Sequence, residues 1–506
     1  MTLDSGICYR ALKARDARFD GRFFVAVSST RIYCRPVCTV RPPKRENCRF
    51  FASAAAAEAG GYRPCLRCRP ELAPGNASVD ATTRLAQAAA TMLEDRAGDE
   101  EGLESVAARL GVTDRHLRRA FGAEFGVSPV EFAQTQRLLL AKRLLTDTAL
   151  PVTEVAFASG FRSVRRFNAL FRERYRLKPG SLRVHRVETG PDALNFELSF
   201  RPPFDWPAVS AFLGARAIAG VEALEDGRYR RTARIESDGK EHAGWVSVGL
   251  SPEKPTLRIA VSASLVKVLP PVLSRVKALM DLACNPAEVG EALGALARPH
   301  PGLRVPGAFD GFEVAVRAIL GQQVSVSAAR TVAGRFAAAF GDAIATPFDA
   351  LGTVFPTAAA VAQLPYGRIA KLGMPGARAR TIVALARAVA EGELVLMPNA
   401  DIEATLERLR ALPGVGEWTA QYIAMRALAW PDAFPHTDLG VMKALGETDA
   451  RRVLAAGEGW RPWRAYAVMH LWQSLTQEPF QSCRNGSSFR GAREELSPRI
   501  VPFSKE

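Results

Sequence analysis

Two groups of side chains in this chain have the types and spacing that chemistry requires. The first is a set of four cysteines in two close pairs, separated by 26 residues: Cys34 and Cys38, then Cys65 and Cys68. The second combines two glycines, two aromatic side chains and a carboxylate: Gly414, Gly416, Trp418, Tyr422 and Asp438. Clustered thiolates can bind a metal and act as nucleophiles. An aromatic surface beside a carboxylate can hold a flat cation and stabilise developing positive charge.

The cysteine spacing predicts a tetrahedral zinc site. Six of the eight cysteines precede residue 69, and the N-terminus lacks the apolar segment of a secretory signal peptide. In a protein of the cytoplasm, clustered cysteines more often bind metal than form disulfides. The spacings Cys-x3-Cys and Cys-x2-Cys suit four thiolate ligands of one Zn²⁺. Taken alone, these residues leave open a zinc site that only stabilises its own domain.

The residues around the cysteines point further. Tyr-Cys-Arg-Pro-Val-Cys, followed by Arg-Pro-Cys-x-x-Cys, resembles the N-terminal domain of Ada-type methylphosphotriester sensors over about residues 5–75. The resemblance implies that the four cysteines bind Zn²⁺ and that Cys34 accepts a methyl group from a DNA phosphotriester. Four thiolates on one Zn²⁺ carry a net charge of about −2, so the sulfur stays nucleophilic. Methylation removes one negative charge, weakens repulsion from DNA phosphates and so offers a switch.

The stretch from 412 to 438 predicts a phosphate site beside an aromatic platform. Gly414 and Gly416 can take backbone angles closed to other residues. The free N–H groups of the helix that follows would face a DNA phosphate. Trp418 and Tyr422 lie one helical turn apart, which predicts a shared face. Asp438 lies in a His-Thr-Asp-Leu-Gly turn, where it can cap a helix or act as a catalytic carboxylate.

Five segments in order resemble the helix-hairpin-helix DNA glycosylases, in the AlkA-type 3-methyladenine DNA glycosylase II branch, over roughly residues 190–478. They are RAILGQQVSV (317–326), LGMPGARA (372–379), LPGVGEWTA (412–420), FPHTDLG (434–440) and WRPWRAYAVMHLW (460–472). The resemblance implies hydrolysis of the N-glycosidic bond of alkylated purines in double-stranded DNA. It gives Asp438 the catalytic position and makes Trp418 and Tyr422 the surface on which the extruded base stacks.

Two residues differ from related patterns: Trp418 from the strand-cleaving members of the wider superfamily, and Gln323 from the AlkA-type pattern. Members that also cleave the DNA strand have a lysine at the position of Trp418, whereas residues 372–442 contain no lysine. The sequence therefore predicts a monofunctional glycosylase that forms no Schiff base. Gln323 stands where the AlkA-type pattern has an apolar residue that enters the minor groove. We expect Gln323 to contact DNA, and its side chain can still occupy that gap, but the sequence leaves open whether it acts as the wedge.

Two helix-turn-helix patterns precede this region. Thr113 and Ser163 are placed to cap the second helix of each pattern, at about 114–122 and 163–173. The arrangement resembles the AraC-type DNA-binding domain over about 85–185, which implies that both second helices enter successive major grooves. A helical bundle with solvated arginines is the alternative. The predicted DNA contacts are Arg115, Arg118, Arg119, Arg165 and Arg166.

The charge distribution favours a polyanionic partner. The chain of 506 residues carries a net charge of +15. Residues 1–190 hold 32 lysines and arginines against 20 acidic residues, so most of the excess lies at the front. No apolar run reaches the length of a membrane span, which predicts a cytoplasmic protein with no membrane partner.

We therefore predict a multidomain, mainly α protein. Its parts are a zinc-bound α+β methyl-acceptor domain (1–78), a tandem helix-turn-helix domain (82–186), an α+β subdomain (191–300), an all-α helix-hairpin-helix glycosylase core (301–478) and a disordered tail (479–506). The expected partners are one Zn²⁺, double-stranded DNA and RNA polymerase, with the chain acting as a monomer. The hypothesis is an alkylation sensor and regulator fused to a glycosylase. The alternative is a regulator only, whose glycosylase fold serves as a DNA clamp.

Overall fold

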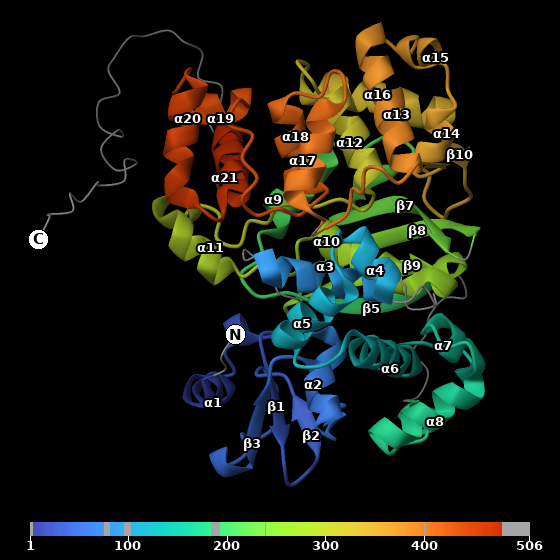
Figure 1. Cartoon of the computed structure of the whole chain (residues 1–506), viewed down its shortest axis with the longest axis vertical. Helices are drawn as coiled ribbons and strands as arrows, with labels where there is room; N and C mark the ends of the chain where they lie inside the picture. Colours follow the sequence, from blue (N-terminus) through green and yellow to red (C-terminus); the bar gives the residue numbers. More distant parts are fainter. Residues whose placement is uncertain are drawn as a thin grey trace, which may run out of the picture.

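The computed structural model describes residues 4–74, 81–95, 103–183, 193–237, 239–398 and 400–477. The predicted tail at 479–506 lies outside these residues. The N-terminal sheet and the C-terminal helices lie at opposite ends of the long axis, with α3 to α6 between them (Figure 1). The predicted class, a mainly helical multidomain protein, is confirmed. No helix among the described residues is both long and apolar enough to cross a membrane.

Residues 4–74 form the N-terminal module, whose centre is a four-stranded sheet with the order β3-β1-β2-β4. Strand β4 runs parallel to β2, and Tyr33 pairs with Pro64. Because Cys34 ends β2 and Cys65 follows β4, this pairing brings the two cysteine pairs together. The elements are α1 (Ser5–Ala14), η1 (Ala17–Phe19), β1 (Phe24–Val27), β2 (Ile32–Cys34), η2 (Arg45–Asn47), β3 (Cys48–Phe51), α2 (Ala54–Ala59), β4 (Arg63–Pro64) and η3 (Pro70–Leu72).

Residues 81–183 form the helix-turn-helix unit. The two predicted caps are confirmed: Thr113 Oγ1 accepts from His116 N at 3.2 Å, and Ser163 Oγ accepts from Arg166 N at 3.3 Å. Phe167 and Phe171 are fully buried beneath the second pattern. The helices are α3 (Ala81–Asp95), α4 (Leu103–Arg109), α5 (Asp114–Phe125), α6 (Pro129–Asp147), α7 (Val152–Ala158), α8 (Val164–Tyr175) and η4 (Pro179–Leu182).

A buried carboxyl group joins the N-terminal module to the helix-turn-helix unit. Glu58, on α2, is 3% exposed. It accepts hydrogen bonds from Tyr33 Oη at 3.0 Å, Tyr175 Oη at 3.1 Å and Thr135 Oγ1 at 3.2 Å. Burial raises the pKa of Glu58 to about 7. Since Tyr33 lies on β2, Thr135 on α6 and Tyr175 at the end of α8, Glu58 links the strand that carries Cys34 to the long helix α6 and to the last helix of the second helix-turn-helix pattern.

The N-terminal parts also pack against the C-terminal half (residues 193–477). Buried apolar side chains of α6 to α8 belong to one continuous cluster with those of that half. The guanidinium of Arg143 lies 4.9 Å from the centre of the Phe196 ring. Arg22 forms an ion pair with Glu288 at 2.5 Å. The three parts of the chain therefore form one packed body.

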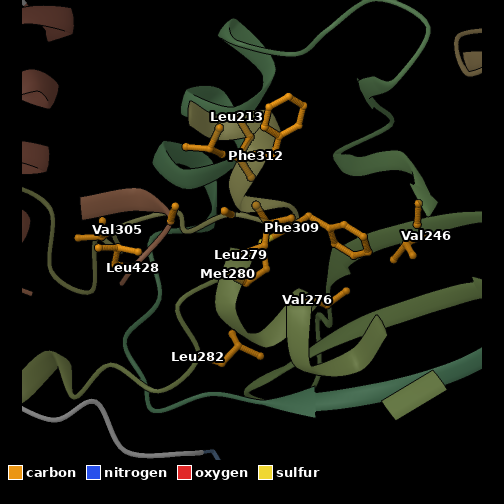
Figure 2. Close-up of a cluster of buried hydrophobic side chains, with 14 of the residues drawn as sticks. Leu213, Val246, Val276, Leu279, Met280, Leu282, Val305, Phe309, Phe312 and Leu428 are labelled. Carbon is orange, nitrogen blue, oxygen red and sulfur yellow. The ribbon is translucent and has the colours of Figure 1, made fainter. Parts of the chain in front are cut away.

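The C-terminal half opens with an antiparallel sheet of order β5-β9-β8-β7-β6. Three segments predict strands: LNFELSFRP (194–202), which alternates apolar and polar residues, GWVSVGL (244–250) and TLRIAVSA (256–263). They are confirmed as β5, β8 and β9, whereas β6 and β7 were not predicted. Figure 2 shows Leu213, Val246, Val276 and Phe312 converging where α9, β8, α10 and α12 meet. The elements are β5 (Ala193–Ser199), α9 (Trp206–Ala215), β6 (Glu222–Glu225), β7 (Arg228–Ser237), β8 (Lys240–Leu250), β9 (Thr256–Ser262), η5 (Ala263–Val268), α10 (Leu269–Leu279), α11 (Pro286–Leu293) and η6 (Gly294–Ala297).

From Gly311 the half is helical, and its turn between α17 and α18 is the hairpin. The expected all-α core needs one correction, because β10 and β11 pair there. Thr353 N also donates to Gly220 O at 2.9 Å, so this segment docks on the preceding subdomain. The elements are α12 (Gly311–Leu320), α13 (Val326–Phe340), β10 (Asp342–Ala343), β11 (Thr353–Val354), α14 (Ala358–Ala362), α15 (Tyr366–Ala370), α16 (Gly376–Ala390), α17 (Ile402–Ala411), α18 (Glu417–Arg426), α19 (Leu439–Leu445), α20 (Ala450–Gly457), η7 (Glu458–Trp460) and α21 (Arg464–Gln477).

Candidate active site and zinc centre

The hairpin turn leaves the start of α18 open. Gly414 has φ +86°, and a Cβ there would lie 2.3 Å from Thr381 Oγ1, so this position requires glycine. Gly416 does not: its φ of −92° is open to other residues, which corrects the prediction of special backbone angles at both glycines. A Cβ on Gly416 would meet nothing within 4 Å. Since this N-cap offers no side-chain hydrogen bond, the first N–H groups of α18 are available to an anion.

The loop between α12 and α13 braces this turn. Gln322 Nε2 donates to Gly414 O and to Thr419 Oγ1, both at 2.9 Å. Gln323, the next residue, has φ +54° and is exposed. Gln322 was not predicted as a site residue, because its two contacts cross more than 90 residues of sequence. The chain thus fixes one glutamine on the hairpin and leaves its neighbour free to face a ligand.

Asp438 is held by three donors. Its Oδ1 accepts from Val441 N at 3.0 Å, so it caps α19. Trp418 Nε1 donates to Oδ2 at 2.7 Å and Trp472 Nε1 donates to Oδ1 at 2.8 Å. The helix cap and the pocket carboxylate are therefore one group. Trp472 was missed as a site residue, although it ends the segment WRPWRAYAVMHLW, whose third tryptophan was the available signal.

The aromatic platform is present. The rings of Trp418 and Tyr422 stack with centroids 5.4 Å apart and planes inclined by 21°. Tyr422 Oη accepts from the Arg426 guanidinium at 2.9 Å. Burial raises the pKa of Tyr422, but the charges of Arg426 and Arg216 outweigh it and lower the pKa overall. The arginines were not predicted, and they place positive charge at the inner edge of the platform.

These groups line one cavity of about 1240 Å³. Its volume exceeds that of most small-molecule sites, so an extruded nucleotide fits. The described lining contains four arginines in addition to Arg426, namely Arg216, Arg317, Arg330 and Arg378, and it contains no lysine. The predicted residues that the cavity brings together are Gln323, Gly414, Gly416, Trp418, Tyr422 and Asp438.

The four cysteines of the N-terminal module form a second candidate site. The sulfurs of Cys34, Cys38, Cys65 and Cys68 all lie within 4.8 Å of one another. Zn–S bonds of about 2.3 Å in a tetrahedron place sulfurs about 3.8 Å apart, so the set fits Zn²⁺. Four negative thiolates at this spacing repel one another, so the set needs a cation. Among the described residues, Cys8 and Cys48 take no part in the cluster.

The sulfurs differ in their surroundings. Arg35 N donates to Cys68 Sγ and Arg67 N donates to Cys65 Sγ, each at 3.4 Å. A backbone hydrogen bond from Val40 reaches Cys38. Among the described residues, no backbone N–H donates to the Cys34 sulfur. Hydrogen bonds draw charge from a thiolate, so the two sulfurs that accept them at 3.4 Å, those of Cys65 and Cys68, are the weaker nucleophiles.

The predicted arginines of the helix-turn-helix unit are exposed on separate elements from the cavity. Arg118 pairs with Asp114 Oδ2 at 2.7 Å, and Arg119 contacts His116 Nδ1 at 3.3 Å. Both pairs are on the outer face of α5, where they add little stability. The full predicted set, Arg115, Arg118, Arg119, Arg165 and Arg166, is solvent-facing on α5 and α8.

Comparison with known proteins matches each part to a family. The matching protein families are the metal binding domain of Ada (residues 7–71), a helix-turn-helix domain (106–185), the AlkA N-terminal domain (195–310) and the HhH-GPD superfamily of base excision DNA repair proteins (316–452). A "Probable bifunctional transcriptional activator/DNA repair enzyme AlkA" from Mycobacterium tuberculosis is 40% identical, over 92% of this chain and 96% of that protein. The chain belongs to that family.

Each half of the family's chain also resembles a separate protein. The "DNA-3-methyladenine glycosylase 2" of Escherichia coli is 36% identical over 56% of this chain and 99% of its own length. The "Bifunctional transcriptional activator/DNA repair enzyme AdaA" of Bacillus subtilis is 31% identical over 35% of this chain and 81% of its own length. The predictions of one Zn²⁺ in the N-terminal module and of a DNA-binding protein are thereby confirmed.

Proposed function

We propose that the chain hydrolyses the N-glycosidic bond of alkylated purines of the 3-methyladenine type in double-stranded DNA. The observation that carries this proposal is the Asp438 carboxylate, which two indole N–H groups hold inside a cavity large enough for a nucleotide. Such purines are positively charged, so stacking on the Trp418 and Tyr422 rings contributes about 0.5–2 kcal/mol. As the base departs, the sugar becomes oxocarbenium-like, and the fixed carboxylate of Asp438 stabilises that charge.

The reaction ends with an abasic site and an intact strand. Strand cleavage by this superfamily needs an amine that forms a Schiff base with the sugar. The described cavity lining carries arginines, whose high pKa prevents that role, and no lysine. The enzyme is therefore monofunctional in one specific respect: it releases the base and does not cleave the DNA strand.

The test is release of 3-methyladenine from methylated duplex DNA by the purified chain, beside an Asp438→Asn variant. We expect the wild type to release the base and the variant to bind DNA with little release. Wild-type protein that binds methylated DNA without releasing bases would instead support the alternative, a regulator whose glycosylase fold is a DNA clamp.

We also propose that Cys34 accepts a methyl group from a DNA methylphosphotriester, once per molecule. When bound, Zn²⁺ supplies the charge that keeps four neighbouring sulfurs as thiolates. The Cys34 sulfur attacks the methyl carbon, an S–C bond forms, the C–O bond breaks and the phosphodiester leaves as an anion. Among the described residues a backbone N–H donates to the sulfurs of Cys65 and Cys68, which favours the Cys34 sulfur over these two.

Mass spectrometry after incubation with methylphosphotriester DNA tests this acceptor. One added methyl at Cys34 is expected, with no further turnover. Cys34→Ser should take up none, while Cys48→Ser, outside the cluster, should behave as wild type. A structural zinc site would leave all cysteines unmodified.

The remaining partners follow from the same proposal. Methylation at Cys34 lowers the negative charge that faces DNA, and Arg115, Arg118, Arg119, Arg165 and Arg166 then hold promoter DNA more tightly. A transcription activator of this kind contacts RNA polymerase. We further propose that it acts as a monomer in the cytoplasm, which sedimentation of the purified chain and fractionation of cells would test.

A further inference from the structure

Exposed apolar side chains are part of the lining of the cavity. Among the described residues eleven large hydrophobic side chains are exposed, and Leu439, at 80%, is the most exposed of them. Single exposed apolar residues are ordinary on protein surfaces. Here, however, Leu439 lines the same cavity as two others of the eleven, Val324 and Val326. Apolar surface collected at one opening indicates a contact surface.

The backbone holds these side chains firmly. Leu439 is the first residue of α19 and follows Asp438 directly, so the cap on Val441 N fixes both residues together. Val326 opens α13, whose cap is Ser325 Oγ, accepting from Ala328 N at 3.2 Å. An exposed leucine at a helix start adds nothing to the core. Leu439 follows Asp438 directly, so we attribute its exposure to a contact with the molecule that enters the cavity.

We propose that Leu439, which lines the cavity together with Val324 and Val326, enters the DNA duplex next to the extruded nucleotide and packs against the flanking base pair. This inference rests on the proposed glycosylase function. Extrusion leaves a gap whose walls are the apolar faces of bases, and a branched apolar side chain fills such a gap without burying polar atoms. Gln323, at the expected wedge position, would bring an amide into that gap, so it suits the groove edge better.

The partner is the base stack itself because the surface is continuous with the lesion pocket. The rim is also bordered by groups that fit DNA phosphates: the open start of α18 at Gly416 and the Arg330 and Arg378 guanidiniums. A duplex that contacts these groups brings its bases over the cavity mouth. A protein partner would not need a rim that opens onto the catalytic carboxylate.

Single-turnover excision by the full-length chain separates this role from others. The substrates are a duplex with one 3-methyladenine and the same strand unpaired. Leu439→Ala should slow excision at least tenfold on the duplex and less than about twofold on the single strand, which has no closed stack to open. Fluorescence of 2-aminopurine placed beside the lesion should show weaker extrusion in the variant. Leu454→Ala, an exposed leucine on α20 outside the cavity, is the matched control and should match wild type.

Several outcomes would overturn the inference. Equal losses on both substrates would mean that Leu439 contacts the extruded base and not the stack. An unchanged duplex rate in Leu439→Ala, with a duplex-specific loss in Gln323→Ala, would assign the gap to Gln323. If Leu439→Ala also lowers the melting temperature, Leu439→Met, which keeps the apolar volume, separates the two roles. A variant that restores the melting temperature but not the duplex rate would refute the inference. Wild-type protein inactive on both substrates would instead refute the proposed function.

Discussion

Replacing Asp438 by asparagine removes one negative charge from the cavity while leaving a residue that caps helices equally well. At about 4 Å and an effective dielectric constant of about 20, a carboxylate attracts a unit positive charge by about 4 kcal/mol. Loss of that attraction corresponds to a rate decrease of roughly 10³-fold. The new amide also points N–H groups at an indole donor, either Trp418 Nε1 or Trp472 Nε1, which misplaces the side chain further.

The assay is single-turnover excision with enzyme in excess, together with binding to a duplex that carries an abasic-site analogue. We expect excision to fall roughly 10³-fold while the dissociation constant stays within about threefold of wild type. Asp401→Asn is the control, because Asp401 Oδ1 caps α17 through Ala404 N at 3.0 Å and Asp401 is not part of the cavity lining. Retention of more than a tenth of the rate by Asp438→Asn, or an equal loss in Asp401→Asn, would refute the electrostatic argument.

Three further predictions concern separate features. Borohydride should not trap the chain on abasic DNA, because the described lining of the cavity has no lysine, and a trapped band on a gel would contradict this. Trp472→Phe keeps an aromatic ring but removes the N–H that donates to Asp438 Oδ1, so excision should slow roughly tenfold or more, whereas Trp460→Phe should not change it. Burial raises the pKa of Glu58 from its ordinary 4.5 to about 7, so the folded state holds a proton that the unfolded chain releases, and stability falls as pH rises through that window. Denaturant unfolding should therefore show the free energy of unfolding of Glu58→Gln rising by about 2.5 kcal/mol relative to that of wild type between pH 5 and pH 8, and a constant difference would contradict the assignment.

The sequence predicted those features of the site that are set by residues close to one another in the chain. Trp418 and Tyr422 share a helix, so their spacing alone predicted a common face. Asp438 lay in a short turn with a recognisable pattern, and the structure places its carboxylate against the indole of Trp418. The cysteine spacings predicted four ligands, which the structure brings within 4.8 Å of one another.

What depended on packing was missed. Trp472 reaches Asp438 across 34 residues because α19 packs against α21, and no local pattern encodes that contact. Strand β7 was also missed, because its sequence contains an arginine at a position that the fold buries. Arg231, 4% exposed, pairs with Glu313 at 2.6 Å, so a charged residue takes an inward position that the apolar alternation of a strand does not predict. The prediction for Gly416 failed for a different reason: glycine can adopt unusual angles but does not have to.

The contact of Arg143 with Phe196 bears on how such a chain is inherited. Proteins similar to each half occur separately, in Escherichia coli and in Bacillus subtilis. In this chain burial lowers the pKa of Arg143 to about 10. Its guanidinium is therefore shielded from water, and it contacts the Phe196 ring of the C-terminal half. A gene split at this boundary would return that group to solvent and uncover Phe196. Fusion also fixes dosage, since every copy of the regulator that a cell makes arrives with one copy of the repair enzyme.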